Sequence, residues 1–400
     1  MLAQRTSLFS SSGTAAARAA AKAAAAAGKE IFDLTAGEIW TDLAPSLRAG
    51  ARDAIDRGIN RYSETVGIEA LRQAIARRLS VETGQLWGPE EIAVTTGAKQ
   101  ALFNAAMLLL NPGDEVIIPA PYWSTFPAQV SIAGGRPVFL DTRANGYVPD
   151  LDALAEATTP RTRAIVVNTP NNPSGTVYDR TTLAGIAELA IERDLWIVFD
   201  ECYGTFAHAP WVHQSIVAMV PEVRSRTIVV NAFSKELGIT GWRLGYLAGP
   251  GEVVKVAKAL QSHTTSNPNV IAQHAVLAHL ENSDGTFEQQ LRARLGMART
   301  KGLSILSSLA HVPIPAAQGG FYFYLDLAEI LTDGQSADDV VSFLLAEAGV
   351  AGVAGTTFGD RCGLRLSYGV PLAVLERGLR SVVKALNTWS GSTPRVKSAS

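Results

Sequence analysis

The feature that most constrains the fold is a repeated alternation, between about residues 90 and 250, of short β-branched runs and longer helical stretches. The predicted strands are Ile92–Thr95, Glu115–Pro119, Pro137–Leu140, Ala164–Val167, Leu195–Phe199, Thr227–Val230 and Leu244–Ala248. These runs are continuously apolar, as is typical of strands buried on both faces. Helical stretches such as Lys99–Leu110, Leu151–Ala157 and Thr181–Arg193 separate them. The alternation predicts an α/β fold, with a mostly parallel sheet flanked by helices.

The texture of the chain changes after about residue 290. The elements expected there are a long polar helix at Glu288–Leu309, an alternating strand at Gly319–Leu325, a helix at Val340–Ala348 and a strand at Leu364–Ser367. Together they predict a smaller α+β unit, which shares its layer with the N-terminal helix.

The first thirty residues are rich in alanine, and their composition fits either a targeting peptide or a helix. Alanine is the best helix former, and Arg18 and Lys22 interrupt any hydrophobic region of a secretion signal, so we favour the helix. Thr14 is expected to cap Ala15–Ala27, and Gly28 is expected to end that helix.

Length suggests two domains, because 400 residues exceed one ordinary domain. The predicted division is 1–47 as the N-terminal segment of the small domain, 48–290 as the large cofactor-binding domain, 291–388 as the C-terminal part of the small domain, and 389–400 as a flexible tail. The small domain is thus expected to contain both ends of the chain.

Composition excludes several classes of protein. With 47% apolar and 18% charged residues, the chain cannot be disordered. No apolar stretch reaches the ~20 residues of a membrane-spanning helix, and a net charge of −2 gives no reason to expect nucleic acid as a partner. Cys202 and Cys362 are too few for a disulfide scaffold and lack metal-ligand spacing, which favours a cytoplasmic location. The low charge indicates that some surface is buried in an oligomer.

Polar side chains follow five of the predicted strands. They are Thr96–Lys99, Tyr122 with Trp123, Asn168 with Asn171–Pro173, Asp200 with Tyr203, and Ser234 with Lys235. In an open parallel sheet, ligands bind beyond the carboxyl ends of the strands. Five such groups at one edge of a sheet therefore predict a binding site.

Each of these residues also has an ordinary structural explanation. The Gly97 turn and the Asn172 turn are common connections, and a single lysine such as Lys235 is usually solvated. Asp200 ends an apolar strand and needs a cationic partner, which either a structural salt bridge or a catalytic site would supply. Arg243 lies between glycines and fits an ordinary strand edge equally well.

Taken together, the residues are more specific. They supply a helix start that can bind phosphate, a flat aromatic, a buried acid, a phenol, a lysine and an arginine. Pyridoxal 5'-phosphate uses all of them, because its aldehyde reacts with a lysine, its ring nitrogen needs a carboxylate, and its phosphate needs amides and an arginine. We therefore expect this cofactor and no metal ion.

Several longer motifs carry a family resemblance. The most specific are Asn231-Ala-Phe-Ser-Lys235, Thr240-Gly-Trp-Arg-Leu-Gly-Tyr246 and Asn168-Thr-Pro-Asn-Asn-Pro-Ser-Gly175, supported by Asp200–Tyr203, Thr96–Ala101 and Arg365–Tyr368. From about Ser10 to Leu386, the chain resembles the fold-type-I pyridoxal-phosphate enzymes, specifically class I/II aminotransferases similar to bacterial aspartate aminotransferases.

The resemblance implies a role for each matching residue. Lys235 would form the Schiff base with the cofactor and move the α-proton. Asp200 would pair with the pyridinium nitrogen, and Tyr203 with Asn172 would hydrogen-bond the ring oxygen. Trp123 would stack on the ring.

The same resemblance assigns the phosphate and the substrate. The implied phosphate ligands are Gly97, Ala98, Lys99, Ser234 and Arg243, with Tyr62 reaching the phosphate of the neighbouring subunit. Arg365 would hold the substrate carboxylate through a bidentate fork, with Gly37, Trp123 and Asn172 beside it. The implied protein is a homodimer with shared active sites, which moves an amino group between an L-amino acid and a 2-oxo acid by a ping-pong mechanism.

Two segments depart from the family pattern. Ile39-Trp40 and Ala354-Gly355 replace the usual Pro-Asp and Pro-Gly, and both would border the substrate side chain. Trp40 favours an apolar donor or packs at a hinge, so the donor stays open. Other chemistry on the same scaffold (β-lyase, racemase, amino acid oxidase or hydroxylase) also stays open. A non-catalytic regulator is disfavoured, because such proteins carry a DNA-binding module in front.

Overall fold

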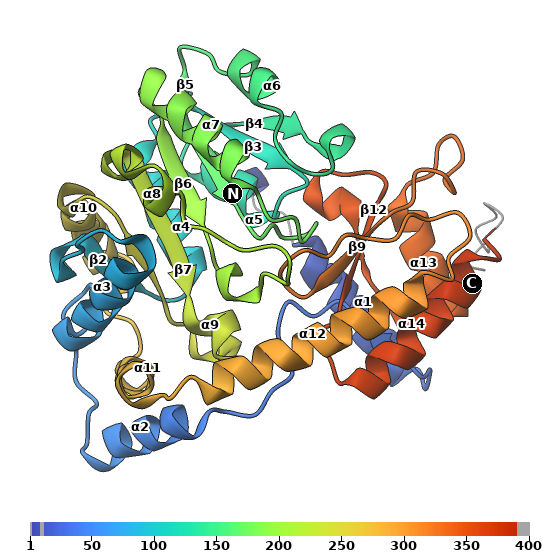
Figure 1. Cartoon of the computed structure of the whole chain (residues 1–400), viewed down its shortest axis with the longest axis horizontal. Helices are drawn as coiled ribbons and strands as arrows, with labels where there is room; N and C mark the ends of the chain where they lie inside the picture. Colours follow the sequence, from blue (N-terminus) through green and yellow to red (C-terminus); the bar gives the residue numbers. More distant parts are fainter. Residues whose placement is uncertain (1, 9–11, 390–400) are drawn as a thin grey trace.

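The computed structural model of the chain describes residues 2–8 and 12–389 (Figure 1). Its centre is a seven-stranded sheet with the order β2-β8-β7-β6-β5-β3-β4. The strands are β2 (Ile92–Thr95), β3 (Glu115–Ala120), β4 (Arg136–Asp141), β5 (Thr162–Asn168), β6 (Trp196–Asp200), β7 (Thr227–Ala232) and β8 (Gly245–Ala248). All of the predicted strands of this sheet are present. The predicted tail lies outside the described residues, apart from Trp389.

The sheet is mostly parallel, as predicted. Strands β3, β4, β5, β6 and β7 pair in parallel, whereas β8 runs antiparallel to both of its neighbours, β2 and β7. The carboxyl ends of these parallel strands therefore lie at one edge of the sheet, where the polar residues of the sequence motifs follow.

Helices cover both faces of this sheet, which explains why its strands are continuously apolar. Ile197 and Phe199 enter the hydrophobic core on one face, and Val198 between them enters the core on the other. The first face is covered by α2 (Pro45–Asp56), α3 (Glu69–Thr83), α6 (Leu151–Glu156), α7 (Arg180–Glu192), α8 (Ile216–Met219) and α11 (Val270–Asn282). The second is covered by α4 (Ala98–Leu109), α5 (Thr125–Ile132) and α10 (Gly251–Ser262).

A second, smaller unit combines α1 and β1 with the elements that follow α11 (Figure 1), whereas the first described turn, Gln4–Leu8, lies against α5 of the large unit. Its strands are β1 (Phe32–Asp33), β9 (Tyr322–Asp326), β10 (Val350–Ala351), β11 (Val353–Ala354) and β12 (Gly363–Ser367). Its helices are α1 (Gly13–Ala26), α12 (Thr286–Leu306), α13 (Ala337–Glu347) and α14 (Leu372–Leu386). Leu34 packs in one core with residues from 291 to 386, and β1 pairs with β10 in parallel. The exact domain boundaries remain a prediction.

The prediction of an alternating strand at Gly319–Leu325 was wrong, because β9 is buried on both faces. Phe323 packs in the core with α12 and α14, whereas Tyr324 packs on the other face against Phe358. Tyr322, also on that other face, lies beside Arg365. The strand therefore separates a hydrophobic core from a site that contains charge.

The N-terminal helix forms, but its predicted cap was wrong. Helix α1 begins at Gly13 after Ser12, so Thr14 lies inside its first turn, and no side-chain cap is formed. A run of alanines forms helix equally well from any position, so composition does not mark the start; at Gly13 itself, Thr357 leaves no room for a Cβ. Gly28 adopts a left-handed conformation (φ 86°) just after the helix ends, as predicted.

In the described part of the chain, no helix is both long enough and apolar enough to cross a membrane.

Candidate active site

The polar residues of the motifs gather at the carboxyl edge of the large sheet. Asn168 ends β5 and Asp200 ends β6, and the two are direct partners in the parallel pairing. The Asn168 side-chain amide donates to the Asp200 backbone carbonyl (3.1 Å), and the Asn172 backbone N–H donates to Asn168 Oδ1 (3.0 Å). The sheet thus fixes the loop that carries Asn172 beside Asp200.

Asp200 is buried, and its carboxylate Oδ1 accepts the backbone N–H of Cys202 (3.1 Å). Burial raises the pKa of Asp200 to about 6, because desolvation disfavours the charged form. The carboxylate therefore has a strong electrostatic reason to bind a cationic nitrogen.

Lys235 lies on α9 (Phe233–Glu236), a single turn that follows β7. Its Nζ donates a hydrogen bond to the backbone carbonyl of Gly37, which belongs to the N-terminal segment. Burial is the main cause that lowers the pKa of Lys235, to about 8, and the charges of Arg365 and Arg243 lower it further. At pH 7, about a tenth of this amine is therefore neutral and can accept a proton, far more than for a lysine of ordinary pKa.

Arg365 on β12 is almost fully buried, with 2% of its surface exposed. Its Nη1 donates to Asn172 Oδ1 (2.8 Å), and its Nη2 donates to the Thr35 carbonyl (3.1 Å). The guanidinium also lies 4.4 Å from the Tyr322 ring centroid and 4.9 Å from that of Phe358. Its Nε is buried without a hydrogen-bond partner among the described residues, so the guanidinium is held in place with donors to spare.

Tyr203 joins the same cluster through its hydroxyl, which lies 3.3 Å from the hydroxyl of Tyr322. Burial raises the pKa of both phenols, so they are neutral and available as hydrogen-bond donors. Tyr322 was not predicted as a site residue. The only signal for it was an aromatic run that we interpreted as a strand.

A second cluster lies at the start of α4. Gly97 precedes the helix with φ 77°, a conformation that favours glycine. A Cβ at Gly97 would lie 2.6 Å from Arg243 Nη2, so only glycine lets this guanidinium approach the helix N-terminus. Arg243 also has positive φ (56°), and its Nη1 donates to the Thr240 carbonyl (2.9 Å). Amides at a helix start beside an arginine form an anion-binding arrangement.

Lys99 and Trp123 border this cluster. The Lys99 Nζ lies 5.1 Å from the centroid of the Trp123 ring, and burial lowers the pKa of Lys99. Trp123 is half-buried and packs edge-on against Phe126 (5.7 Å). Ser234, on α9 next to Lys235, is buried. A Cβ at Gly245 would meet the Ala98 nitrogen at 2.8 Å, so β8 also packs directly against the start of α4.

Tyr62 and Trp40 do not join these clusters. Tyr62 is 89% exposed, and Trp40 is also largely exposed. The Trp40 carbonyl accepts a hydrogen bond from Arg294 Nη2 (2.6 Å), and its ring lines a surface groove with Leu372. The geometry of Trp40 thus agrees with packing between segments. The other departing segment does border the site, because Phe358 of its loop stacks on Arg365.

Other residues of the site were missed from the sequence. Thr35 supplies a carbonyl to Arg365, and Glu38 accepts hydrogen bonds from Thr240 Oγ1 (3.1 Å) and from Arg18 Nη2 (2.8 Å). The only local signal was that Glu38 follows Gly37. These contacts join the N-terminal segment to loops that lie two or three hundred residues away along the chain.

Comparison with known proteins agrees with this geometry. The sequence model of the family described as "Aminotransferase class I and II" matches residues 29–382. The chain belongs to this family. It is 38% identical to the aspartate/prephenate aminotransferase of Thermus thermophilus, over 96% of this chain and 98% of the relative. It is 35% identical to the aspartate aminotransferase of Bacillus sp. strain YM-2, again over 96% and 98%.

Solved aminotransferase structures have the same fold. The aspartate aminotransferase of Thermus thermophilus with maleate superimposes with a TM-score of 0.91 at 36% identity, covering 96% of this chain and all (100%) of that one. The enzyme from Rhizobium meliloti gives 0.91 at 32% identity, covering 97% and 99%. The prediction of a fold-type-I, pyridoxal-phosphate-dependent aminotransferase is therefore confirmed.

Proposed function

We propose that this aminotransferase holds pyridoxal 5'-phosphate between Lys235, Asp200 and the start of α4, and that Arg365 binds the carboxylate of the amino acid and 2-oxo acid substrates. The observation that carries the proposal is the convergence of Lys235, Asp200 and Arg365 in one buried region of mixed charge. Burial of three ionisable groups is costly unless each meets a partner of suitable charge. The cofactor and substrate supply those partners.

The residues present fit the cofactor. Asp200 is a buried carboxylate whose raised pKa indicates that it lacks a full positive partner among the protein groups. Gly97, Ala98 and Arg243 offer amides and a guanidinium to a phosphate, with Lys99 and Ser234 close by. Tyr203 and Asn172 offer a hydroxyl and an amide next to Asp200, and Trp123 offers a flat ring. When bound, pyridoxal phosphate supplies an aldehyde that condenses with amines and a ring that withdraws electrons from the α-carbon.

Lys235 is placed to move the proton. With a pKa of about 8, the amine is neutral in about a tenth of the molecules at pH 7, so it can accept the α-proton at Nζ and return it elsewhere. Asp200 would hold a proton on the ring nitrogen by its negative charge. Arg365 would fix the substrate carboxylate, and Gly37 would present its backbone beside Lys235. Because one pocket serves both substrates, they bind in turn.

The relatives indicate which substrates to test first. Their names refer to aspartate and to prephenate as substrates, and this chain shares their full length. We propose an L-amino acid donor, with aspartate as the first candidate. The departure at Ala354-Gly355, whose loop borders Arg365, is a reason to test apolar donors in parallel.

The assembly we propose is a cytoplasmic homodimer with shared active sites. Tyr62 is compatible with this assembly, because its ring is 89% exposed and is therefore free to contact a neighbouring subunit.

Substitution Lys235→Ala tests the proposed site. We expect loss of the visible absorption band of the bound cofactor and loss of transamination, measured with aspartate and other donors against 2-oxoglutarate. Asp333→Ala, on the surface of the smaller unit, is the matched control and should leave both unchanged. Retention of the band by the lysine variant would overturn the assignment, and ammonia or peroxide release by the wild type would favour another reaction.

A further inference from the structure

We propose that Arg78 and Glu236 are positioning residues, whose buried ion pair holds α9 so that Lys235 points at the reacting carbon. Nothing in the sequence motifs singles out either residue. The inference rests on the proposed role of Lys235, and it adds the contact that orients this amine.

Helix α9 needs an external anchor because it is only one turn long. It contains four residues, Phe233–Glu236, and its N-terminus has no side-chain cap. A single turn has almost no stability of its own. Lys235 and Glu236 are consecutive, so their side chains leave the turn about 100° apart. A bond to Glu236 therefore fixes the rotation of the turn without contacting the amine.

The bond to Glu236 is a complete fork. Arg78 Nη1 donates to Glu236 Oε1 (2.8 Å), and Nη2 donates to Glu236 Oε2 (2.7 Å). The third nitrogen of the Arg78 guanidinium is also paired, because Nε donates to Glu82 Oε1 (2.7 Å). The Glu236 side chain is only 8% exposed. Two parallel hydrogen bonds to one carboxylate fix its direction as well as its distance, which a single contact cannot do.

The other side chains of α9 restrain it less specifically. Phe233 packs in the core, with its ring centroid 5.8 Å from that of Tyr246. In the part of the chain that the structure describes, the Lys235 Nζ donates only to the Gly37 carbonyl, and that bond must break when the amine reacts. Among the described residues, Glu236 makes the only ion pair of α9. The Phe233 backbone N–H also donates to the Leu244 carbonyl (3.2 Å), which holds the start of the turn. The fork to Glu236 is therefore the directional restraint that a side chain of α9 keeps throughout the reaction.

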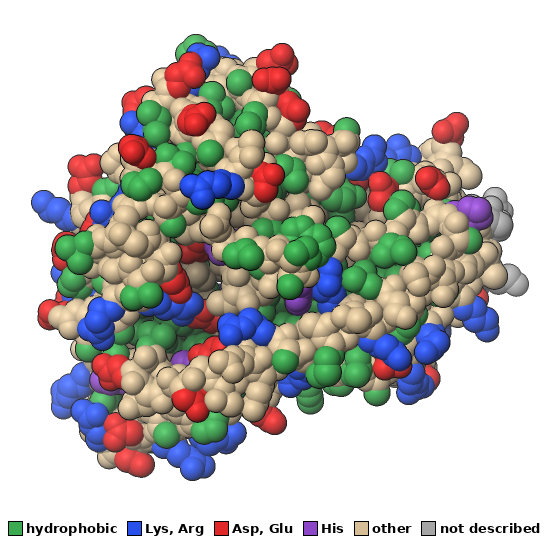
Figure 2. Space-filling view, viewed as in Figure 1, with side chains coloured by type: hydrophobic (Ala, Val, Ile, Leu, Met, Phe, Trp, Pro, Cys, Tyr) green, Lys and Arg blue, Asp and Glu red, His purple; other side chains and the backbone are tan. Residues whose placement is uncertain are grey.

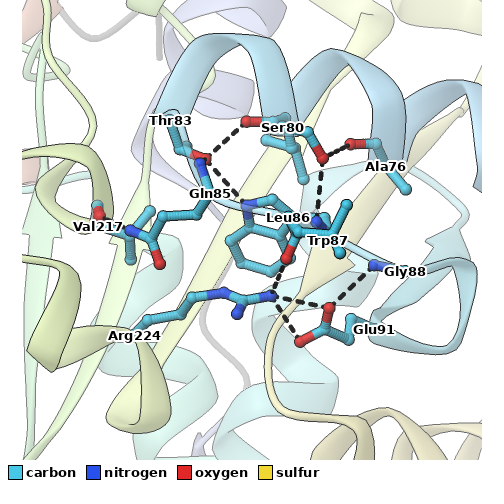
Figure 3. A network of polar contacts seen from close by, with 11 residues as sticks. Ala76, Ser80, Thr83, Gln85, Leu86, Trp87, Gly88, Glu91, Val217 and Arg224 are labelled. Atoms are coloured by element: carbon cyan, nitrogen blue, oxygen red, sulfur yellow. Dashed lines mark hydrogen bonds and ion pairs between the residues drawn. The ribbon is translucent and has the colours of Figure 1, made fainter.

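Arg78 can serve as an anchor because α3 is itself fixed at its C-terminal end (Figure 3). The Trp87 indole donates to Thr83 Oγ1 (3.0 Å), and the Trp87 backbone N–H donates to Ser80 Oγ (2.9 Å). Arg224 covers the Trp87 ring at 4.2 Å and pairs with Glu91 at 2.7 Å. These bonds tie the end of α3 to the chain that leads into β2, so Arg78 projects from a rigid support.

A polar cavity makes the position of this pair sensitive to substitution. Arg78, Glu82, Glu201 and His213 line a cavity of about 370 Å³. Figure 2 shows a hollow left of centre that both acidic and basic side chains border. If one partner is replaced, the other can turn into this space and become hydrated. Helix α9 would then lose the restraint from the Glu236 side chain, while the fold survives.

The test compares Glu236→Gln with the same substitution at another buried carboxylate that pairs with arginine. Glu115 is a fully buried carboxylate bound by Arg136 and Arg161 at the start of β3, at the opposite end of the strands from the site. Glu115→Gln therefore removes the same charge from a comparable environment. Both variants keep the full chain and the bound cofactor, and both should lower the melting temperature.

Only Glu236→Gln should alter Lys235. We expect kcat to fall roughly 10- to 100-fold with KM within about twofold, because misplacement of a catalytic group by about 1 Å has effects of this size. Two readouts do not depend on activity. They are the pH midpoint of the cofactor's visible band, which should move, and the fraction of Lys235 that carries cofactor after borohydride reduction, measured by mass spectrometry, which should fall.

The outcomes separate the two proposals. If Lys235→Ala keeps the visible band, the proposed function fails. If Lys235→Ala loses it but Glu236→Gln matches Glu115→Gln in kcat, pH midpoint and reduced fraction, only the positioning role fails. Should Glu236→Gln not fold, Arg78→Lys is used under the same criteria, because lysine keeps the charge but cannot form the fork.

Discussion

Replacement of Arg365 by lysine should weaken substrate binding far more than cofactor binding. The guanidinium has five N–H donors, and two of them are used by Asn172 Oδ1 and the Thr35 carbonyl. The buried Nε has no partner among the described residues, so a substrate carboxylate can take a fork of donors that the protein itself leaves free. A lysine ammonium keeps the charge but offers only a point contact.

The size of the loss follows from these contacts. One charge-assisted hydrogen bond to the carboxylate is lost, at about 1.5–3 kcal/mol. The contacts of the guanidinium with the rings of Tyr322 (4.4 Å) and Phe358 (4.9 Å) are lost as well. These contacts contribute about 0.5–1 kcal/mol, so the total loss of binding free energy is roughly 2–4 kcal/mol. At about 1.4 kcal/mol for each factor of ten, kcat/KM should fall roughly 30- to 1,000-fold.

The assay is steady-state kinetics for the amino donor and for the 2-oxo acid, with cofactor affinity measured by absorbance titration. Because both substrates present a carboxylate to one arginine, both kcat/KM values should fall to a similar extent. Arg377→Lys is the control, since Arg377 also lies over a ring (Phe32, 4.9 Å) and pairs with a carboxylate but is remote from the site. Equal loss of cofactor and substrate affinity, or a loss of kcat/KM below about threefold, would refute the carboxylate role.

Two further predictions concern stability and assembly. Hydrogen bonds, first of all from Arg136, lower the pKa of Glu115 from its ordinary 4.5 to about 2. The ionised carboxylate therefore stabilises the fold fully above about pH 4.5, and this contribution is lost as the pH falls toward 2. The difference in melting temperature between wild type and Glu115→Gln should therefore shrink over that range, and a constant difference would contradict the pairing. If Tyr62 reaches a neighbour's phosphate, the mass in solution should be twice 42.4 kDa, and Tyr62→Phe should weaken cofactor binding roughly tenfold or more. A fully active monomer would rule out the shared site.

Local pattern predicted most of the large sheet. Residues Ile197–Phe199 of β6 are all apolar because each face of the strand meets its own core, and that requirement is visible in a few consecutive residues. The same reasoning failed for β9, because Tyr322 and Tyr324 are buried against groups that no local window reveals. It failed for the start of α1 because consecutive alanines contain no positional signal.

The candidate site divides in the same way. Asp200 and Lys235 were predicted because each stands where a strand ends, a position that the chain itself marks. The carbonyl of Thr35 and the ring of Tyr322 were not predicted, since they become partners of Arg365 only through long-range packing. Arg78 and Glu236 lie 158 positions apart, so their fork is visible only in three dimensions.

The parallel pairing of β1 with β10 has a consequence for biosynthesis. Ribosomes make the chain from its N-terminus, yet Phe32 pairs with Val350, which is synthesised roughly three hundred residues later. Until then, Phe32 lacks its strand partner, and Arg365, which donates to the Thr35 carbonyl, has not been made. The large sheet can assemble while the chain is being made, but the pocket around Lys235 is completed only after translation has almost finished. A nascent chain that stalls before β10 would therefore contain the complete large sheet but an incomplete pocket around Lys235.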